Sequence, residues 1–198
     1  MTSDHILIER WKARDQQAAE ALYNQYNKQI FRLAYGMLMN LADAEEVMQD
    51  TLLYALSNIQ RYDSNKASFQ TWLHKIAVSR CRDKRRRKQL AKIPLWTWID
   101  KGGDAAEPQP LPEYLAIAQD NHDHIWQAVQ SLSPKLVEVI ILRYWAGHTF
   151  REIAEILDCP LPTAQSRAQF AHKKLRAMLQ SDEPIRDEQI HLGREIIK

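Results

Sequence analysis

Residues that break helices are almost absent from the first ninety positions. Pro94 is the first proline of the chain, and Gly36 is the one glycine before Gly102. Because proline and glycine interrupt helices more strongly than other residues, long helices can run through this segment. Apolar residues within positions 16–40 recur at three- and four-residue intervals, the spacing of one buried stripe on a helix. The sequence therefore predicts an all-α N-terminal domain.

Two more helices follow from the same periodicity. Residues 42–59 place apolar side chains on one face, and carboxylates gather at the start of the other face, where the helix dipole favours them. A polar loop over residues 61–67 precedes a third helix with Phe69, Trp72 and Leu73 on its apolar stripe. The residues from Arg80 to Lys92 are mostly Lys and Arg. This helix therefore combines a core face with a cationic surface.

A change of composition after Lys92 marks a domain boundary. The following residues are rich in Pro, Gly, Asp and Glu, which is typical of an extended linker. We expect two helical domains joined by a flexible linker: an N-terminal domain (1–92), the linker (93–120), a C-terminal domain (121–181) and a tail of unknown role (182–198). The two domains are expected to move semi-independently in the free protein.

The C-terminal domain begins with clear helix-boundary signals. Ser133 and Pro134 form an N-cap and first-turn pair, and Gly147 can end the helix that they begin. Thr149 and Glu152 have the spacing of a capping box, which predicts a second, short helix.

A longer helix follows the turn at residues 158–160. Because a residue before proline avoids the helical region, Leu161 is expected to be extended and the helix to begin at Pro162. Its alanines form a narrow inward seam, and its opposite side is polar. This arrangement is typical of a helix-turn-helix, whose second helix enters the major groove of DNA. An ordinary helical hairpin with a solvated face is the alternative.

The basic run at residues 80–92 also allows more than one interpretation. Cations near Trp72 and Phe69 suit single-stranded nucleic acid, because cations bind phosphates while aromatic rings stack on bases. A solvated helix end or a localisation-like cluster would have the same composition. Trp72 lies on the apolar stripe, so it can be a core residue instead of a platform for bases.

No pattern in the sequence indicates an enzyme. Cys81 and Cys159 lie far from each other and outside any Cys/His cluster, so neither a disulfide framework nor a zinc site is expected. The acidic segment 43–50 contains no His or Cys, and His122 and His124 would point apart on a helix. We therefore expect no metal, no cofactor and no catalytic residue. Without a signal peptide or a long apolar run, the chain is expected to be soluble and cytoplasmic, with no membrane insertion.

Three motifs in this sequence resemble those of a known family. They are DAEEVMQDTLLYAL (residues 43–56), ASFQTWLHKIA (67–77) followed by Asp83 and three arginines (85–87), and LSPKLVEVIILRYWAGHTFREIAEIL through TAQSR (132–167). In this order they resemble the extracytoplasmic-function (ECF) group of bacterial RNA polymerase sigma factors. The resemblance covers both predicted domains but not the linker or the tail.

The resemblance implies a role for each surface. The second helix would dock on core RNA polymerase through Asp43, Glu46, Gln49, Asp50 and Leu53. The loop and third helix would recognise and melt the minus-ten promoter element and capture a flipped base, through Asn65, Lys66, Phe69, Trp72, Lys75, Ser79, Arg80, Arg85, Arg86 and Arg87. The helix-turn-helix would read the minus-thirty-five element of promoter DNA through Arg151, Thr163, Gln165, Ser166, Arg167, Gln169, Phe170, Lys173 and Lys174. The linker would thread through polymerase channels, and an anti-sigma factor would cover the polymerase-binding surface.

The chain departs from the family pattern at a few positions. Ser79 stands where the family commonly has Asn, and Phe170 and His172 replace two usual arginines. Two other functions therefore stay open. One is a sigma-like adaptor that binds polymerase or an anti-sigma protein without melting DNA. The other is a helix-turn-helix repressor that binds duplex alone, although it would leave the acidic segment 43–50 unexplained.

Overall fold

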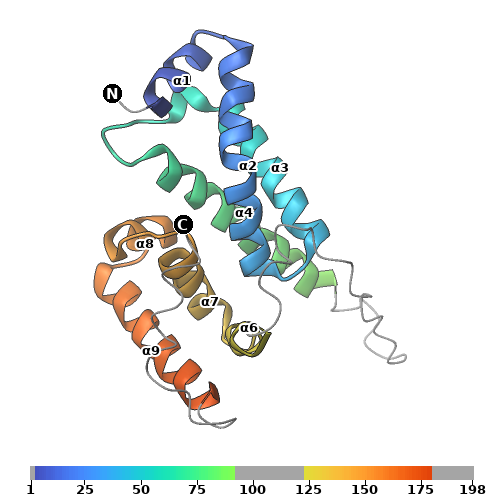
Figure 1. Ribbon diagram of the computed structural model, residues 1–198, viewed down its shortest axis with the longest axis vertical. Helices are drawn as coiled ribbons and strands as arrows, with labels where there is room; N and C mark the ends of the chain where they lie inside the picture. Colours follow the sequence, from blue (N-terminus) through green and yellow to red (C-terminus); the bar gives the residue numbers. More distant parts are fainter. Residues whose placement is uncertain (1–2, 92–122, 180–198) are drawn as a thin grey trace.

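The computed structural model describes residues 3–91 and 123–179, and within these ranges every regular element is a helix. Residues 3–91 form an N-terminal unit and residues 123–179 a C-terminal unit (Figure 1). The all-α fold with two helical parts is as predicted. The predicted linker (93–120) and tail (182–198) lie outside the described residues.

The N-terminal unit is built on three long helices, α2 (Gln16–Leu38), α3 (Leu41–Ser57) and α4 (Phe69–Ala91), with α1 (Ser3–Lys12) and a short 3-10 turn (Ile59–Arg61) at one end. Asp15 and Asn40 cap α2 and α3 because their side chains accept hydrogen bonds from first-turn amides. Buried apolar side chains from α2, α3 and α4 fill the space between them, among them Leu22, Ile30, Val47, Leu52 and Leu73.

Two helices of the C-terminal unit begin where the capping signals predicted them, at Pro134 and Phe150. The unit contains α6 (Asp123–Gln130), α7 (Pro134–Ile140), a π-helical turn (Ile141–Trp145), α8 (Phe150–Leu157) and α9 (Leu161–Leu179). Gly147 has φ +74°, where a Cβ would be strained, so it can end the π-helical segment. The capping box of Thr149 and Glu152 is present. Ser133 occupies the N-cap position, but its side chain makes no capping hydrogen bond.

One predicted boundary is wrong by a residue. Leu161 is helical instead of extended, so α9 begins at Leu161 and not at Pro162. Pro162 then lies in the first turn, where its missing N–H needs no intrahelical acceptor. The carbonyl of Pro160 accepts hydrogen bonds from the amides of Thr163 and Ala164, at 2.9 and 3.2 Å. These hydrogen bonds stabilise the first turn of α9 with Leu161 as its first residue.

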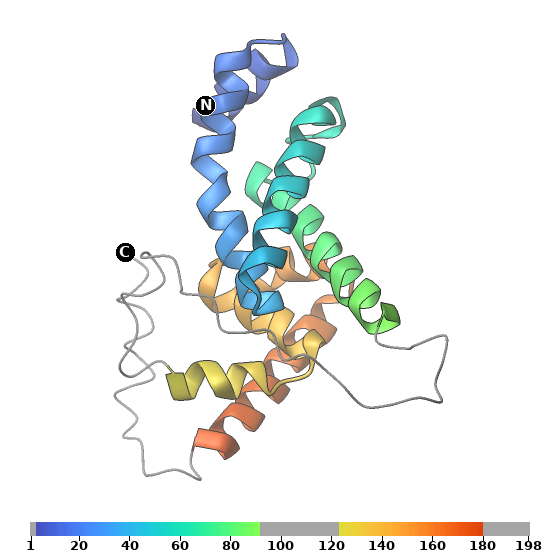
Figure 2. The same cartoon turned by 90° about the vertical axis from the view of Figure 1, so that its right-hand side faces the viewer.

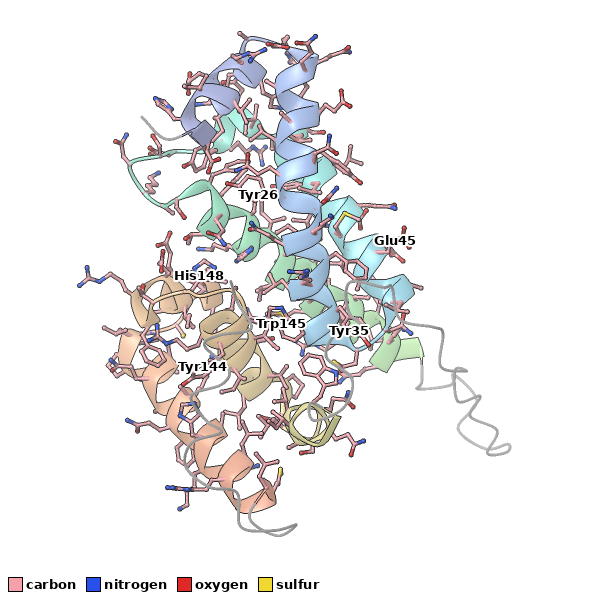
Figure 3. All side chains as sticks on the ribbon, viewed as in Figure 1. Tyr26, Tyr35, Glu45, Tyr144, Trp145 and His148 are labelled. Atoms are coloured by element: carbon pink, nitrogen blue, oxygen red, sulfur yellow. The ribbon has the colours of Figure 1, made fainter. Side chains whose placement is uncertain are left out.

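The two units are in direct contact, as both views of the fold show (Figures 1 and 2). The C-terminal unit lies against α2 and α4, and buried side chains of both units form one continuous apolar core. At Gly36 of α2, an added Cβ would meet Ile141 at 3.0 Å, so the glycine permits this close approach. Tyr35 and Trp145 lie at the same junction (Figure 3), and each ring packs against Trp126. The structure thus joins two domains that the sequence led us to expect as separate.

Candidate polymerase and nucleic-acid interfaces

An acidic strip runs along the outer face of α3. Glu46, Gln49, Asp50 and Leu53 are all exposed, and their spacing of three, one and three residues places them on one side of the helix. Leu53 is 69% exposed, the largest exposed fraction among the large apolar side chains of the described residues. We call these four residues the α3 strip. It has the mixed acidic and apolar character of a docking surface for another protein.

Asp43 differs from the rest of the predicted polymerase-binding set. It is buried at the start of α3 and forms ion pairs with Lys84, at 3.6 Å, and with Lys88 of α4. Glu46 also pairs with Lys84, and this hydrogen bond raises the pKa of the lysine. These pairs join α3 to α4, so Asp43 has a role in the fold that the sequence did not reveal.

Aromatic rings hold the loop that precedes α4. Phe69 is buried and packs edge-on against Tyr26 and Tyr62, with ring centroids 5.3 and 5.2 Å apart. The hydroxyl of Tyr62 donates to the carbonyl of Ala67 at 3.1 Å, which closes the loop. Trp72 touches this cluster from a half-buried position. Phe69 is therefore a support for the loop, and Trp72 is the ring that is partly open to solvent.

The predicted minus-ten residues share an exposed surface only in part. Asn65 and Lys66 in the loop and Lys75, Ser79, Arg86 and Arg87 on α4 are exposed. Lys75, Ser79 and Arg86 fall on one stripe of α4, because their spacings of four and seven residues return to the same side of a helix. Arg80 is half-buried and lies over the ring of Tyr54, 5.1 Å from its centroid.

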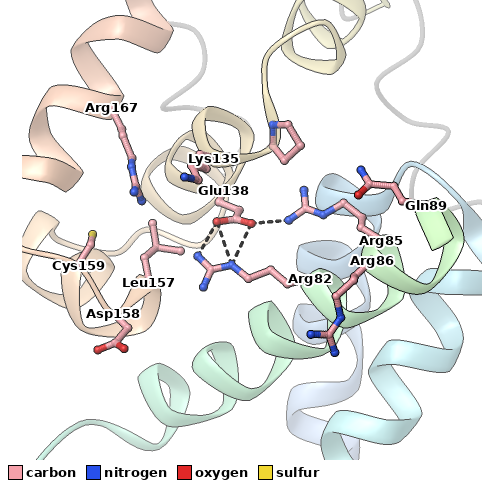
Figure 4. Close-up of a pocket in the computed structure, with 11 residues that line it drawn as sticks. Arg82, Arg85, Arg86, Gln89, Lys135, Glu138, Leu157, Asp158, Cys159 and Arg167 are labelled. Carbon is pink, nitrogen blue, oxygen red and sulfur yellow. Dashed lines mark hydrogen bonds and ion pairs between the residues drawn. The ribbon is translucent and has the colours of Figure 1, made fainter.

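A buried carboxylate from the C-terminal unit holds two arginines of α4. Glu138 of α7 is 2% exposed, and its Oε2 accepts a hydrogen bond from Nη2 of Arg82 at 2.7 Å. Arg85 donates to the other oxygen of the same carboxylate (Figure 4). We call Glu138, Arg82 and Arg85 the inter-unit ion cluster. Arg85 belongs to the predicted minus-ten surface, so this surface is partly engaged within the protein.

The inter-unit ion cluster borders an open cavity of about 420 Å³ between α4, α7 and α9. Figure 4 shows Arg167 of α9 extending toward it from the opposite side. Sequence reasoning missed Glu138, although one signal was present. It is a charged residue inside the apolar run 136–142, and such a residue is rarely buried without a partner.

Two histidines meet where α4 faces the start of α8. Nδ1 of His74 lies 2.6 Å from Nε2 of His148, and both side chains are buried. Burial lowers the pKa of His74 to about 3 and also lowers the pKa of His148. Both rings are therefore neutral at neutral pH, and the N–H of one ring donates to the unprotonated nitrogen of the other. No local pattern in the sequence indicates this pair, because the two residues are 74 positions apart.

The helix-turn-helix presents its predicted polar side to solvent. Ala164, Ala168 and Ala171 are buried against α7 and α8, which seats α9 closely. Five predicted DNA-binding residues of α9 are exposed, namely Gln165, Gln169, Phe170, Lys173 and Lys174.

The other four predicted residues differ in exposure. Arg151 of α8 is exposed, whereas Thr163, Ser166 and Arg167 are half-buried. The Ser166 hydroxyl donates to the Thr163 carbonyl at 3.1 Å. Within the described part of the chain, no ion pair involves Arg167, Lys173 or Lys174.

Comparisons with known proteins match both units. Residues 22–91 match the family described as sigma-70 region 2, and residues 122–175 match sigma-70 region 4. The ECF RNA polymerase sigma factor SigW of Bacillus subtilis is 29% identical over 177 residues, with 87% of this chain and 94% of SigW covered. The ECF sigma-E factor of Escherichia coli K12 is 27% identical, with 83% and 88% covered. The chain belongs to the ECF group of the sigma-70 family.

Two solved structures share this fold. CnrH, solved in complex with the cytosolic domain of CnrY, aligns with a TM-score of 0.65 at 21% identity, covering 92% of this sigma factor and all of the solved chain. RpoE of Bartonella quintana, solved with the anti-sigma factor NepR, aligns with a TM-score of 0.63 at 20% identity, covering 83% and 98%. The family matches and the ECF relatives show that the chain is a sigma factor, which directs the initiation of transcription at promoters.

Neither a metal centre nor a membrane span is present in the described residues. Among residues 3–91 and 123–179, no group of three His, Cys, Asp or Glu side chains is arranged to hold a metal ion. None of the helices described for this sigma factor combines the length and apolar character that a bilayer crossing requires.

Proposed function

We propose that the α3 strip docks on core RNA polymerase. The observation that supports this most strongly is Leu53, a large apolar side chain that is 69% exposed beside acidic and amide side chains. Protein interfaces commonly combine such an apolar centre with a polar surround. Asp43 contributes indirectly, because its ion pairs with Lys84 and Lys88 fix α3 against α4.

The loop before α4 and the exposed stripe of α4 bind the minus-ten element. Lys75, Arg86 and Arg87 are cations that suit phosphates, and half-buried Trp72 can stack on an unpaired base. The aromatic cluster around Phe69 keeps the loop in place while it holds the melted strand. Because the ring of Phe69 is buried, its part in this proposal is to support the loop.

Helix α9 reads the minus-thirty-five element as duplex. Gln165, Gln169 and Arg167 have side chains that hydrogen-bond base edges in the major groove, and Lys173 and Lys174 suit phosphates. The buried alanine seam supports this role because it lets the helix sit low on its own domain and present a long polar side. Arg151 of α8, which is exposed, contacts the backbone of the same duplex.

Both promoter elements cannot be bound while the two units stay in contact. The elements are about 25 base pairs apart, a span on the order of 80 Å at roughly 3.4 Å per base pair. In this structure Arg82 and Glu138, from different units, are 2.7 Å apart. The units therefore separate when the sigma factor joins polymerase and promoter.

The chain acts in the cytoplasm, without catalysis of its own, and is held inactive by an anti-sigma factor. One structural relative, RpoE of Bartonella quintana, was solved in complex with the anti-sigma factor NepR. The α3 strip is a natural target, because covering it would block polymerase.

Transcription in vitro with core polymerase tests the proposal. We expect initiation from a promoter selected by the holoenzyme and none from a template with both elements scrambled. A variant with Leu53→Asp should bind core polymerase more weakly, and Leu90→Asp, also an exposed leucine but outside the α3 strip, is its control. Binding to core without initiation would favour the adaptor function instead.

A further inference from the structure

One apolar ring interrupts the polar side of α9. Phe170 is 63% exposed, although it lies at the middle of the helix. The side chains three and four positions away on its helix are Ser166, Arg167, Lys173 and Lys174, all of them polar or charged. In the free protein this ring is therefore in water with no apolar helical neighbour.

The position of Phe170 excludes a role in the core of its own unit. The core-facing side of α9 is occupied by the buried residues Ala164, Ala168 and Ala171. The other exposed aromatic nearby, Tyr144, hydrogen-bonds His172 at 2.7 Å on a different flank of the helix. Among the described residues, no aromatic ring pairs with Phe170.

The surroundings of Phe170 point to DNA as its partner. Arg167, Lys173 and Lys174 surround the ring with positive charge that no carboxylate of the described residues neutralises. Such charge complements a phosphate backbone, and the second helix of a helix-turn-helix lies in the major groove, where its exposed polar side faces the base edges. In the major groove, the one apolar group on a base edge is the C5 methyl of thymine.

We propose that Phe170 reads a thymine of the minus-thirty-five element by packing against its C5 methyl group. This inference rests on the proposed reading of that element by α9. It makes Phe170 a specificity-determining residue, because cytosine, adenine and guanine offer no methyl group there. Packing removes apolar surface of the ring from water, and the flanking cations supply the affinity for any sequence.

Replacement of single thymines by deoxyuridine tests the proposal, since this change removes only the methyl group. Holoenzyme would first select its preferred minus-thirty-five duplex from a random pool with a fixed minus-ten element. Each thymine of the selected duplex would then be replaced in turn, and binding of the wild-type holoenzyme measured. We expect one replacement to weaken binding about fourfold, the effect of returning one methyl group to water.

Three variants make the result specific to Phe170. With Phe170→Ala the same deoxyuridine should have no effect, whereas Phe170→Leu should keep part of it because leucine is also apolar. Tyr144→Ala, which removes the other exposed aromatic, should behave as the wild type. Since Phe170 is exposed, none of its variants should unfold the protein.

Each other outcome has a definite meaning. Sequence-specific binding without any methyl effect, or a selected site without thymine, would overturn the role of Phe170 and leave the reading by α9 intact. Equal binding to selected and scrambled duplexes would overturn the reading by α9 itself. If Phe170→Ala weakens core polymerase binding in the absence of DNA, the ring contacts protein and the proposal is wrong.

Discussion

The two basic helices of this sigma factor differ in what their positive charges contact. On α4, Arg82 and Arg85 are held by Glu138, and Lys84 and Lys88 pair with carboxylates of α3. On α9, by contrast, Arg167, Lys173 and Lys174 have no carboxylate partner among the described residues. Helix α4 has the denser run of cations in the sequence, yet four of them, Arg82, Lys84, Arg85 and Lys88, are already paired with carboxylates of other helices. Charge counted along a chain thus overstates the charge that a folded surface presents.

This difference suggests an order of events. Helix α9 can meet duplex DNA as it stands, whereas α4 gains Arg82 and Arg85 only when Glu138 leaves. Under the proposed function, separation of the units therefore releases Arg85 to the predicted minus-ten surface. Surface pairs such as Arg86 with Asp83, at 3.1 Å, add little to this control, because exposed pairs contribute roughly 0–1 kcal/mol.

The largest expected effect comes from removing both arginines of the inter-unit ion cluster. Arg82→Ala with Arg85→Ala leaves the Glu138 carboxylate buried without a partner, at a cost on the order of 3–5 kcal/mol. Separation of the units relieves this cost by hydrating the carboxylate, so the free protein should expand while its helicity persists. Small-angle scattering and circular dichroism measure these two properties. Adding Glu138→Leu should restore the compact form, and a compact Arg82/Arg85 variant would contradict the role of the cluster.

The next effect concerns the free cations and amides of α9. Arg167→Ala or Gln169→Ala should weaken binding to the preferred minus-thirty-five duplex by about 1–3 kcal/mol if the residue contacts a base. A scrambled duplex should be bound as before. Holoenzyme titrations on both duplexes measure the difference. Equal effects on the two duplexes would mean that these residues bind phosphates only.

Acid should loosen the contact between α4 and the C-terminal unit. His74 has its pKa lowered to about 3 by burial, and the pKa of His148 is also lowered. Because the separated units bind protons below the ordinary pKa of about 6.5, the closed form is fully stable above that pH and loses stability as pH falls toward 3. The decrease is about 1.4 kcal/mol per pH unit for each histidine that titrates.

Scattering between pH 7.5 and 4.5 measures this decrease. Two charged groups face the histidine pair. The carboxylate of Glu152 lies near His148 and partly opposes the lowering of the His148 pKa. Arg143 donates a hydrogen bond to the His148 carbonyl at 2.9 Å. A variant with His74→Leu and His148→Leu should lose the pH dependence. A wild-type radius that is the same at both pH values would exclude the histidine contribution.

The smallest effect is expected from phosphate binding by α4. Replacing Arg85, Arg86 and Arg87 with alanine should weaken holoenzyme binding equally on matched and scrambled promoters. The slope of log affinity against log salt should become shallower by up to about 0.7–0.9 for each phosphate that the variant no longer neutralises. Lys12→Ala, a change of one cation on α1, is the control and should leave the slope unchanged. A wild-type slope in the triple variant would mean that these three arginines bind no phosphate.

The sequence predicted local structure well, because periodicity and caps act over a few residues. The starts of α2 and α4, the capping box at Thr149 and the alanine seam of α9 all followed from spacing. The α3 strip and five of the eight predicted DNA-binding residues of α9 are exposed, whereas Asp43 is buried and Thr163, Ser166 and Arg167 are half-buried. Their contacts with polymerase and DNA stay predictions.

Contacts between the units could not be predicted in the same way. They join residues such as His74 and His148, or Arg82 and Glu138, that are 74 and 56 positions apart. Only two indirect signals were present, a lone glycine within α2 at Gly36 and a lone carboxylate within the apolar run of α7. Each residue indicates that another part of the chain packs closely against it, but neither indicates which residue that is.

Separation of the units on the promoter is the central claim, and a distance between them tests it most directly. Spin labels on Gln60→Cys and Gln127→Cys would report it, because both positions are exposed, one in each unit and outside the proposed binding surfaces. Cys159→Ser removes the half-exposed native thiol, while buried Cys81 can stay. We predict a single, narrowly distributed distance in the free protein and a distance longer by tens of ångströms in the complex with polymerase and promoter. The same distance in both states would contradict the account.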